Sequence, residues 1–258
     1  MTTPLPAARR RIGWRVLSFD RLDSTNTHGL TLAGDAKNHG VVIVAGAQTA
    51  GRGQHGRSWL ATPGSSVLMS ALVFPPPELR QPARLTAWAA VAVCDLIRQV
   101  IGKHGRIKWP NDVLINQRKV CGILIEQRTV GPHVATVAGI GLNVSQDAQS
   151  FAAVNLPDAG SLAMFADRVP DAAAVAQMLL PCLDRTYQEL EAGDSAALEQ
   201  RWRHHLDLTG RQVIVEGTRA TYRGTIQDIG FDEFRLELPG GESLRLAPEE
   251  IRHIHQDP

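Results

Sequence analysis

The sequence predicts a mixed α/β (α+β) fold, a mixed sheet with packed helices, followed by a small C-terminal β-barrel of SH3-like size. Apolar β-branched runs at 41–45 and 66–73 predict buried strands, and the apolar segment 83–101 predicts a buried helix. From residue 208 onward, short alternating segments are separated by glycines, which is typical of a small barrel. We therefore expect a large domain over residues 12–208 and the barrel over residues 209–258.

The large domain begins with a short strand at 17–19 and a cluster of helix-capping residues. Ser24, Thr25 and Asn26 bring two hydroxyl groups and an amide to the start of the next helix. A helix needs only part of this set for its N-cap. The cluster fits a plain cap, and its surplus polar groups are also suited to hydrogen-bond the head group of a polar ligand.

A loop at 47–59, rich in glycine and arginine, connects the two buried strands. It holds three glycines, two arginines and a histidine. Glycine lets the backbone bend closely around a ligand, and the planar guanidinium group of arginine suits carboxylates and phosphates. The pattern favours a mobile basic loop that closes over an anion, although a solvated surface loop fits this stretch alone equally well.

Part of this loop, residues 51–56, has the spacing G-x-G-x-x-G of a dinucleotide-binding fingerprint. That fingerprint requires a helix that begins at the glycines. Trp59 and Pro63 follow instead without helical periodicity, and no Gly-Lys-Ser/Thr sequence ends the loop. The sequence therefore disfavours both a dinucleotide site and a P-loop here.

A second polar group follows the predicted helix, at the end of a short strand. Lys108, Trp109, Asn111 and Asp112 place a cation, an aromatic ring, an amide and a carboxylate within five positions. Pro110 fixes this segment as a turn and excludes a helix. A Pro-Asn-Asp turn with a core tryptophan is the simpler interpretation, and a ligand-binding turn is the alternative.

The rest of the large domain is predicted to hold a hairpin, one more strand and two helices. The hairpin spans 113–126 and has Lys119 in its turn at 116–119, a position where lysine is usually solvated. The strand at 134–140 runs into alternate glycines, which indicate close approach of a ligand or of another strand, and Asn143 could bond a ligand or its own turn. The two helices are expected over residues 172–191 and 195–206.

Composition limits the class of protein. The chain has 258 residues and a formal net charge of +1, so no general nucleic-acid-binding surface is indicated. The three cysteines lie in apolar surroundings at unrelated spacings, which is typical of buried thiols in a reducing compartment. No apolar run is long enough to span a membrane, and no signal-peptide core follows the basic start. We expect a cytoplasmic protein whose residues 1–11 are disordered.

Three predicted loops carry cations and polar groups at strand ends, which favours an enzyme that handles anions. To join a carboxylate to ATP, an enzyme must bring two anions together and stabilise the charge that grows at the α-phosphate. Fixed cations and backbone N–H groups meet that need. Magnesium is expected on the phosphates, and Asp112 is a candidate to help hold it. No defensible Ser-His-Asp order and no His/Cys metal spacing is present.

Taken together, these motifs resemble those of the biotin–protein ligases. The likeness covers the chain from about residue 18 to its end, barrel included, and it rests on five motifs in a fixed order. These motifs are residues 24–26, 48–59, 108–112, 118–126 and 139–143. Each motif is weak alone, whereas five in sequence followed by a barrel are highly specific.

The resemblance implies a class II synthetase-like catalytic domain and a reaction in two steps. Biotin and MgATP would give biotinyl-5′-adenylate and pyrophosphate, and a lysine of a biotin carboxyl carrier domain would then attack the adenylate and release AMP. By position, the implied biotin site consists of Ser24, Thr25, Asn26, Gln48, Arg52, Gly53, Gln54 and Lys119. The implied ATP and adenylate site consists of Arg52, Arg57, Trp59, Lys108, Asn111, Asp112 and Asn143. The implied catalytic residues are Lys119, Arg52 and Asp112.

The chain departs from the family pattern at two points. Gln54 stands where many relatives have an arginine, which leads us to expect weaker retention of the adenylate unless His55 or Arg57 compensates. Only some twenty residues precede Ser24, too few for the N-terminal helix-turn-helix of some relatives, so we expect a monofunctional ligase that binds neither DNA nor membranes. A lipoate–protein ligase and a non-catalytic biotin- or nucleotide-binding regulator are the alternatives. A homodimer through a sheet edge is left open.

Overall fold

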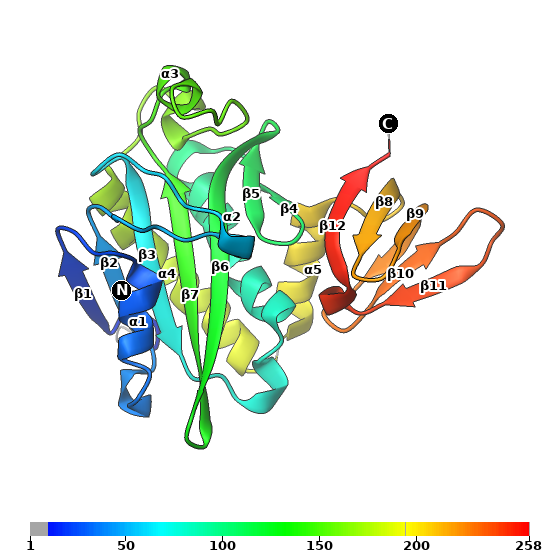
Figure 1. Cartoon of the computed structure of the whole chain (residues 1–258), viewed down its shortest axis with the longest axis horizontal. Helices are drawn as coiled ribbons and strands as arrows, with labels where there is room; N and C mark the ends of the chain where they lie inside the picture. Colours follow the sequence, from blue (N-terminus) through cyan, green and yellow to red (C-terminus); the bar gives the residue numbers. More distant parts are fainter. Residues whose placement is uncertain (1–9, 194, 258) are drawn as a thin grey trace, which may run out of the picture.

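The large part of the molecule is built on a seven-stranded sheet. The computed structural model describes residues 10–193 and 195–257. The strand order is β1-β2-β3-β7-β6-β5-β4, and every neighbouring pair is antiparallel except β1 and β2 (Figure 1). The strands are β1 (Arg15–Phe19), β2 (Val41–Ala45), β3 (Ser66–Val73), β4 (Arg106–Lys108), β5 (Asp112–Ile115), β6 (Arg118–Val130) and β7 (His133–Asn143). This arrangement confirms the expected mixed sheet.

Helices cover the two faces of this sheet unequally. The short helix α1 (Thr25–Thr31) lies on one face, whereas α2 (Pro82–Ile101) and α4 (Ala172–Glu191) pack on the other (Figure 1). Alternation along β7 explains the difference. Ala138, Ile140 and Leu142 belong to the main core, while Val137 packs in a small separate cluster with residues after α1. The α1 face therefore carries only a small apolar cluster, and residues of α1 and β7 also line a cavity there.

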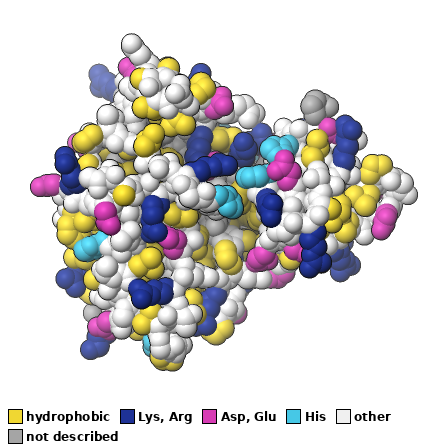
Figure 2. Space-filling view, in the orientation of Figure 1, with side chains coloured by type: hydrophobic (Ala, Val, Ile, Leu, Met, Phe, Trp, Pro, Cys, Tyr) yellow, Lys and Arg dark blue, Asp and Glu magenta, His cyan; other side chains and the backbone are white. Residues whose placement is uncertain are grey.

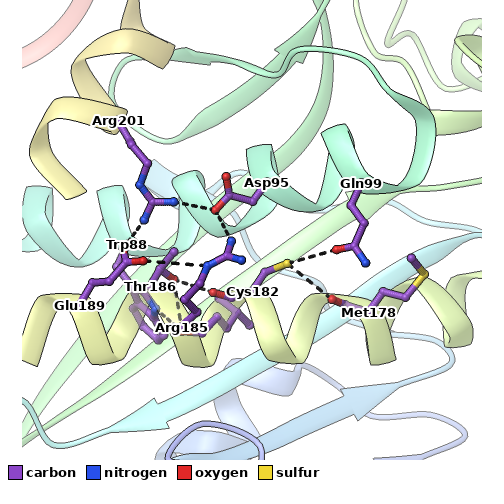
Figure 3. A network of polar contacts seen from close by, with 10 residues as sticks. Trp88, Asp95, Gln99, Met178, Cys182, Arg185, Thr186, Glu189 and Arg201 are labelled. Carbon is purple, nitrogen blue, oxygen red and sulfur yellow. Dashed lines mark hydrogen bonds and ion pairs between the residues drawn. The ribbon is translucent and has the colours of Figure 1, made fainter. Parts of the chain in front are cut away.

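Ion pairs join the helices that cover the main core. Asp95 of α2 accepts hydrogen bonds from Arg185 of α4 at 2.8 Å and from Arg201 of α5 (Ser195–Leu206) at 2.9 Å (Figure 3). Glu189 of α4 also pairs with Arg201. Beneath this network, the Nε1 group of Trp88 donates to the carbonyl of Leu183 at 2.9 Å. The three helices are thus joined by one shared carboxylate.

Asp95→Asn is expected to lower the free energy of unfolding by about 1 kcal/mol, because two guanidinium groups would lose their shared counter-charge in a partly exposed setting. Urea denaturation at low and high salt would measure the change. The difference from the wild-type protein should shrink at high salt. Equal denaturation midpoints at low salt would mean that the network adds nothing to stability.

A second sheet follows the helices and forms the barrel. Its order is β11-β10-β9-β8-β12, and all its pairs are antiparallel. The strands are β8 (Gln212–Gly217), β9 (Thr221–Ile229), β10 (Phe234–Glu237), β11 (Ser243–Leu246) and β12 (Ile251–Gln256). The barrel strands expected from the sequence are present, whereas β12 was not predicted. β12 closes the sheet beside β8 and faces the large sheet (Figure 1).

The two sheets share one hydrophobic core. Trp109, from the turn between β4 and β5, packs edge-on against Phe234 of β10 at 4.9 Å between ring centroids. Trp202 of α5 lies between Trp109 and Phe231. The Nε1 group of Trp109 donates to the carbonyl of Ile251 at 3.0 Å. The simpler interpretation of Trp109, as a core residue of a turn, is correct for its side chain.

Several other expectations can be compared with the structure. The three cysteines are free and buried, as expected. The segment Ala148–Ala152 forms a helix, α3, that was not predicted. Of the expected disordered start, residues 1–9 lie outside the described residues, while the backbone N–H of Arg11 donates to Asp184 at 2.8 Å. No helix within residues 10–193 and 195–257 has the length and apolar character needed to cross a membrane.

Candidate functional site

A cavity of about 410 Å³ opens on the face of the large sheet that carries α1, next to the barrel. Its volume lies in the range of small-molecule sites. All the site residues expected from the sequence line this one cavity. Figure 2 shows Lys, Arg and His side chains gathered along the hollow between the large sheet and the barrel. The structure thus brings the predicted set together, and the individual roles stay predictions.

The start of α1 forms a buried polar wall. Ser24 is the N-cap and accepts from the N–H of Thr27, as the sequence predicted. The N–H and hydroxyl groups of Thr25 lie 2.7 and 3.1 Å from Oε1 of Gln48, which ties α1 to the basic loop. Ser70 of β3, which was not predicted, places its Oγ 2.6 Å from Oδ1 of Asn26. The wall is therefore preorganised for a polar head group by contacts within the protein.

Glu126 is a second residue that the sequence analysis did not assign. Its carboxylate accepts from the Nδ2 group of Asn26 at 2.8 Å and from Arg52 at 2.6 Å. Since Glu126 lies on β6, it links the polar wall, the loop and the sheet. The pairing holds the guanidinium group of Arg52 at the cavity edge, with 39% of its side chain exposed. Only the fold could show this contact, because 74 residues separate the partners.

The basic loop folds back on itself over the cavity. The N–H of Gly53 donates to the carbonyl of Arg57 at 2.7 Å, and that of Trp59 donates to Gly51 at 2.9 Å. A single 3₁₀ turn, Gln54–Gly56, lies at its tip, with His55 at a φ of 55°. No long helix begins at these glycines, which agrees with the sequence argument against a dinucleotide fingerprint.

Trp59 lies on a floor made of two glycines. Gly122 of β6 and Gly141 of β7 are register partners, and a Cβ atom at either would come within 3 Å of the indole ring. A Cβ at Gly139 would likewise collide with the amide of Asn26. The alternate glycines therefore make room for side chains of the site, rather than for another strand. The Nε1 group of Trp59 is buried without a hydrogen-bond partner among the described residues.

Lys119 and Asp112 form an ion pair of 2.6 Å in the cavity. The predicted turn at 116–119 is shorter than expected: Asn116 and Gln117 both have positive φ, as in a two-residue hairpin turn, so Lys119 lies in strand β6. Its Nζ is half-buried and lies 5.8 Å from the ring centroid of Trp59. Asp112 holds the ammonium group in place.

The ion pair with Lys119 affects whether Asp112 can help to hold magnesium, as the sequence suggested. The Oδ1 atom of Asp112 is engaged by Lys119, which does not suit a resident metal ligand. Across residues 10–193 and 195–257, no group of three or more His, Cys, Asp or Glu side chains is arranged to hold a metal ion. The residues present fit a cation that arrives on a ligand's phosphates better than one bound by the protein.

The two asparagines assigned to the nucleotide side are bonded within the protein. The Nδ2 group of Asn111 donates to the carbonyl of Ile123 at 2.6 Å, and that of Asn143 donates to Gly160 at 3.0 Å. Both residues are buried and line the cavity. Asn143 thus bonds a neighbouring loop, which is neither of the two partners that the sequence left open. In this structure the side chains of both asparagines therefore stabilise the lining of the cavity through bonds within the protein.

Burial also decides the chemistry of the nearest thiol. Cys121 lies next to Lys119 in β6, and burial raises its pKa far above the usual range of cysteine. The Lys119 charge opposes the shift but does not cancel it. The thiol therefore stays protonated at neutral pH and is unsuited to act as a nucleophile.

Two further parts of the lining were missed by sequence reasoning. Residues 155–159, after α3, border the cavity beside Lys119, and the carbonyl of Asp158 accepts from the Lys119 N–H at 2.9 Å. His253 of β12 also lines it. These residues carry no motif, and they reach the cavity only through the packing of the chain.

Comparison with known proteins places the chain in a family. Residues 18–143 match the profile of the biotin/lipoate A/B protein ligase family. The bifunctional ligase/repressor BirA of Bacillus subtilis is 33% identical over 235 residues, which cover 91% of this chain and 72% of the relative. The biotin–[acetyl-CoA-carboxylase] ligase of Mycobacterium tuberculosis is 34% identical over 260 residues, covering 94% and 90%. The chain therefore belongs to the biotin/lipoate A/B protein ligase family.

Solved structures agree on the fold. A biotin protein ligase from Aquifex aeolicus, in complex with biotin and ATP, matches with a TM-score of 0.77 at 20% identity. The match covers 94% of this chain and 99% of that one. At this identity the comparison shows a shared fold over nearly the whole chain, barrel included.

Proposed function

We propose that the protein is a biotin–protein ligase. It activates biotin with ATP as biotinyl-5′-adenylate and transfers the biotinyl group to a lysine of a biotin carboxyl carrier domain. The observation that carries the proposal is the cavity itself, which joins the buried polar wall of α1 to the Lys119–Asp112 pair and the arginines of the loop. The named relatives support the choice of biotin and of the carboxylase carrier.

The geometry fits a carboxylate that lies between a polar recognition end and a cationic reaction end. The wall of Thr25 and Asn26 faces an uncharged head group, here the ureido ring of biotin. Lys119, oriented by Asp112, offsets the repulsion between the carboxylate and the α-phosphate and the charge that grows there. A carboxylate oxygen attacks the α-phosphorus, the bond to the bridging oxygen breaks, and pyrophosphate leaves.

The second step needs less from the protein. The mixed anhydride already has a good leaving group, so the neutral amine of the carrier lysine attacks its carbonyl carbon and AMP departs. The amine loses a proton in this step. ATP is expected to arrive with magnesium on its phosphates, since Asp112 is paired with Lys119. We place the reaction in the cytoplasm, a reducing compartment that suits three free, buried cysteines.

ATP–pyrophosphate exchange with biotin or lipoate as the only added acid tests the proposal. Exchange with biotin alone, in magnesium buffer, is the expected result. Exchange with lipoate alone would move the assignment to the other branch of the family. A folded protein that binds biotin but exchanges with neither acid would instead be a non-catalytic regulator.

Gln54 offers a prediction within the same reaction. Its side chain is half-buried and lines the cavity, so it can hydrogen-bond a phosphate but adds no charge. Gln54→Arg is expected to slow dissociation of biotinyl-5′-adenylate by about fivefold, since a charge-assisted hydrogen bond exceeds a neutral one by about 1 kcal/mol. Release of labelled adenylate from preloaded enzyme measures the rate. If release is no slower in the variant, His55 or Arg57 already supplies the missing charge.

A further inference from the structure

The last strand of the barrel contributes to the cavity. His253 of β12 lines it, as do His55 and Arg57 at the tip of the basic loop. The hydrogen bond between Trp109 and the carbonyl of Ile251, 3.0 Å long, fixes β12 beside the turn that follows Lys108. The position of His253 is therefore set by the shared core, on the same cavity wall as the tip of the basic loop.

Charged groups from three elements surround His253. Within the barrel, the charged neighbours of His253 are Glu216 of β8 and His255 of β12. Glu216 and His255 form an ion pair with each other at 3.2 Å. Arg57 and His55 face it from the loop. Burial is the main cause that lowers the pKa of His253, the cations add to it, and Glu216 opposes it. Because the net effect lowers the pKa despite Glu216, the imidazole of the free protein is mostly neutral at pH 7.

On the basis of the proposed function, we propose that His253 binds the polyphosphate of ATP, so that the barrel supplies part of the adenylation site. Together with Arg57 and Lys108, its ring forms the side of the cavity that favours a polyanion. Gln54 brings no charge to this side, which leaves room for a cation from another element. His253 becomes an imidazolium when the phosphates arrive and takes its proton from solvent.

Because ATP binding is coupled to protonation of His253, the affinity for ATP is expected to fall as pH rises. An anion beside the ring raises its pKa in the complex, whereas burial lowers it in the free protein. ATP therefore binds most tightly below the free pKa, which lies under the ordinary value of 6.5, and binding weakens as pH rises toward the pKa of the complex. The loss of affinity is about tenfold for each unit that separates the two pKa values.

The test is the KM for ATP in biotin-dependent exchange, measured between about pH 6 and about pH 8. In wild type the KM for ATP is expected to rise several-fold over this interval. His253→Gln should raise it at the acidic end and flatten the profile, with the KM for biotin unchanged. His253→Lys, which keeps a positive charge, should hold the KM for ATP low across the interval. His133→Gln is the matched control, an exposed histidine at the start of β7 that does not line the cavity, and it should keep the wild-type profile.

The outcomes separate this inference from the proposed function. An active His253→Gln enzyme with the wild-type KM for ATP at every pH would overturn the role of His253 and leave the ligase assignment intact. If the KM for ATP rises in His253→Gln and His253→Lys does not restore it, the role of His253 is structural, and the inference is also overturned. Absence of exchange in wild type would reject the function itself. Titration with magnesium pyrophosphate in two buffers of different ionisation enthalpy then tests proton uptake at His253 directly.

Discussion

Lys119→Ala is expected to lower kcat/KM for biotin-dependent ATP–pyrophosphate exchange by about 100- to 1,000-fold. Lys119 is a half-buried cation of the cavity, and its ammonium group is held 2.6 Å from Asp112. Removing it leaves the carboxylate of biotin and the α-phosphate without that charge, and leaves Asp112 as an extra negative charge. Both changes raise the barrier to adenylation.

Two control experiments test whether this effect is specific to Lys119 and to the adenylation step. Lys103→Ala removes an exposed lysine just after α2 and should leave the exchange rate unchanged. When preformed biotinyl-5′-adenylate is supplied, the Lys119→Ala enzyme should transfer the biotinyl group at a rate closer to that of wild type, because the second step begins with a good leaving group. Exchange within about threefold of wild type would show that Lys119 is not part of the adenylation machinery.

The second large effect is expected from Gly141→Ala. A Cβ at this position would lie 2.7 Å from Cζ2 of Trp59, well inside ordinary carbon–carbon contact, and neither β7 nor the ring can move freely. The indole must lift from its floor and carry the end of the basic loop with it. We expect kcat/KM for exchange to fall by about tenfold or more, and adenylate to dissociate about tenfold faster.

Gly34→Ala is the matched control, because a Cβ there meets no atom within 4 Å. Combining Gly141→Ala with Trp59→Ala tests the mechanism. If the clash with the ring is the cause, the double variant should be no worse than Trp59→Ala alone. An additive loss would instead point to direct contact between the new methyl group and the ligand.

Local residue patterns were enough to predict most elements and many residues that line the cavity, but not their contacts. β-branched runs such as Val41–Ala45 and the capping set at Ser24 act through near neighbours, so sequence alone reveals them. β12 escaped prediction because two histidines and an arginine interrupt its apolar positions, and its pairing with β8 is non-local. Glu126 became visible only when the fold brought Arg52 beside it.

Other differences follow from which face of a strand a residue occupies. Ser70 looks like a minor polar residue in a core strand, yet its side of β3 faces Asn26 and the polar wall. The glycines at 139 and 141 were correctly taken as points of close approach, but the approaching groups are the side chains of Asn26 and Trp59. A period of two residues gives the alternation, and only tertiary structure says what lies on each side.

The bond from Trp109 to Ile251 also has a consequence for biosynthesis. Its two partners are 142 residues apart in sequence, so the turn of Lys108 and Asp112 gains this support only after β12 has left the ribosome. A nascent chain that already contains the basic loop, Lys119 and both long helices still lacks one wall of its cavity. A chain that ends before β12 therefore lacks both the bond that supports this turn and the part of the cavity wall that His253 forms.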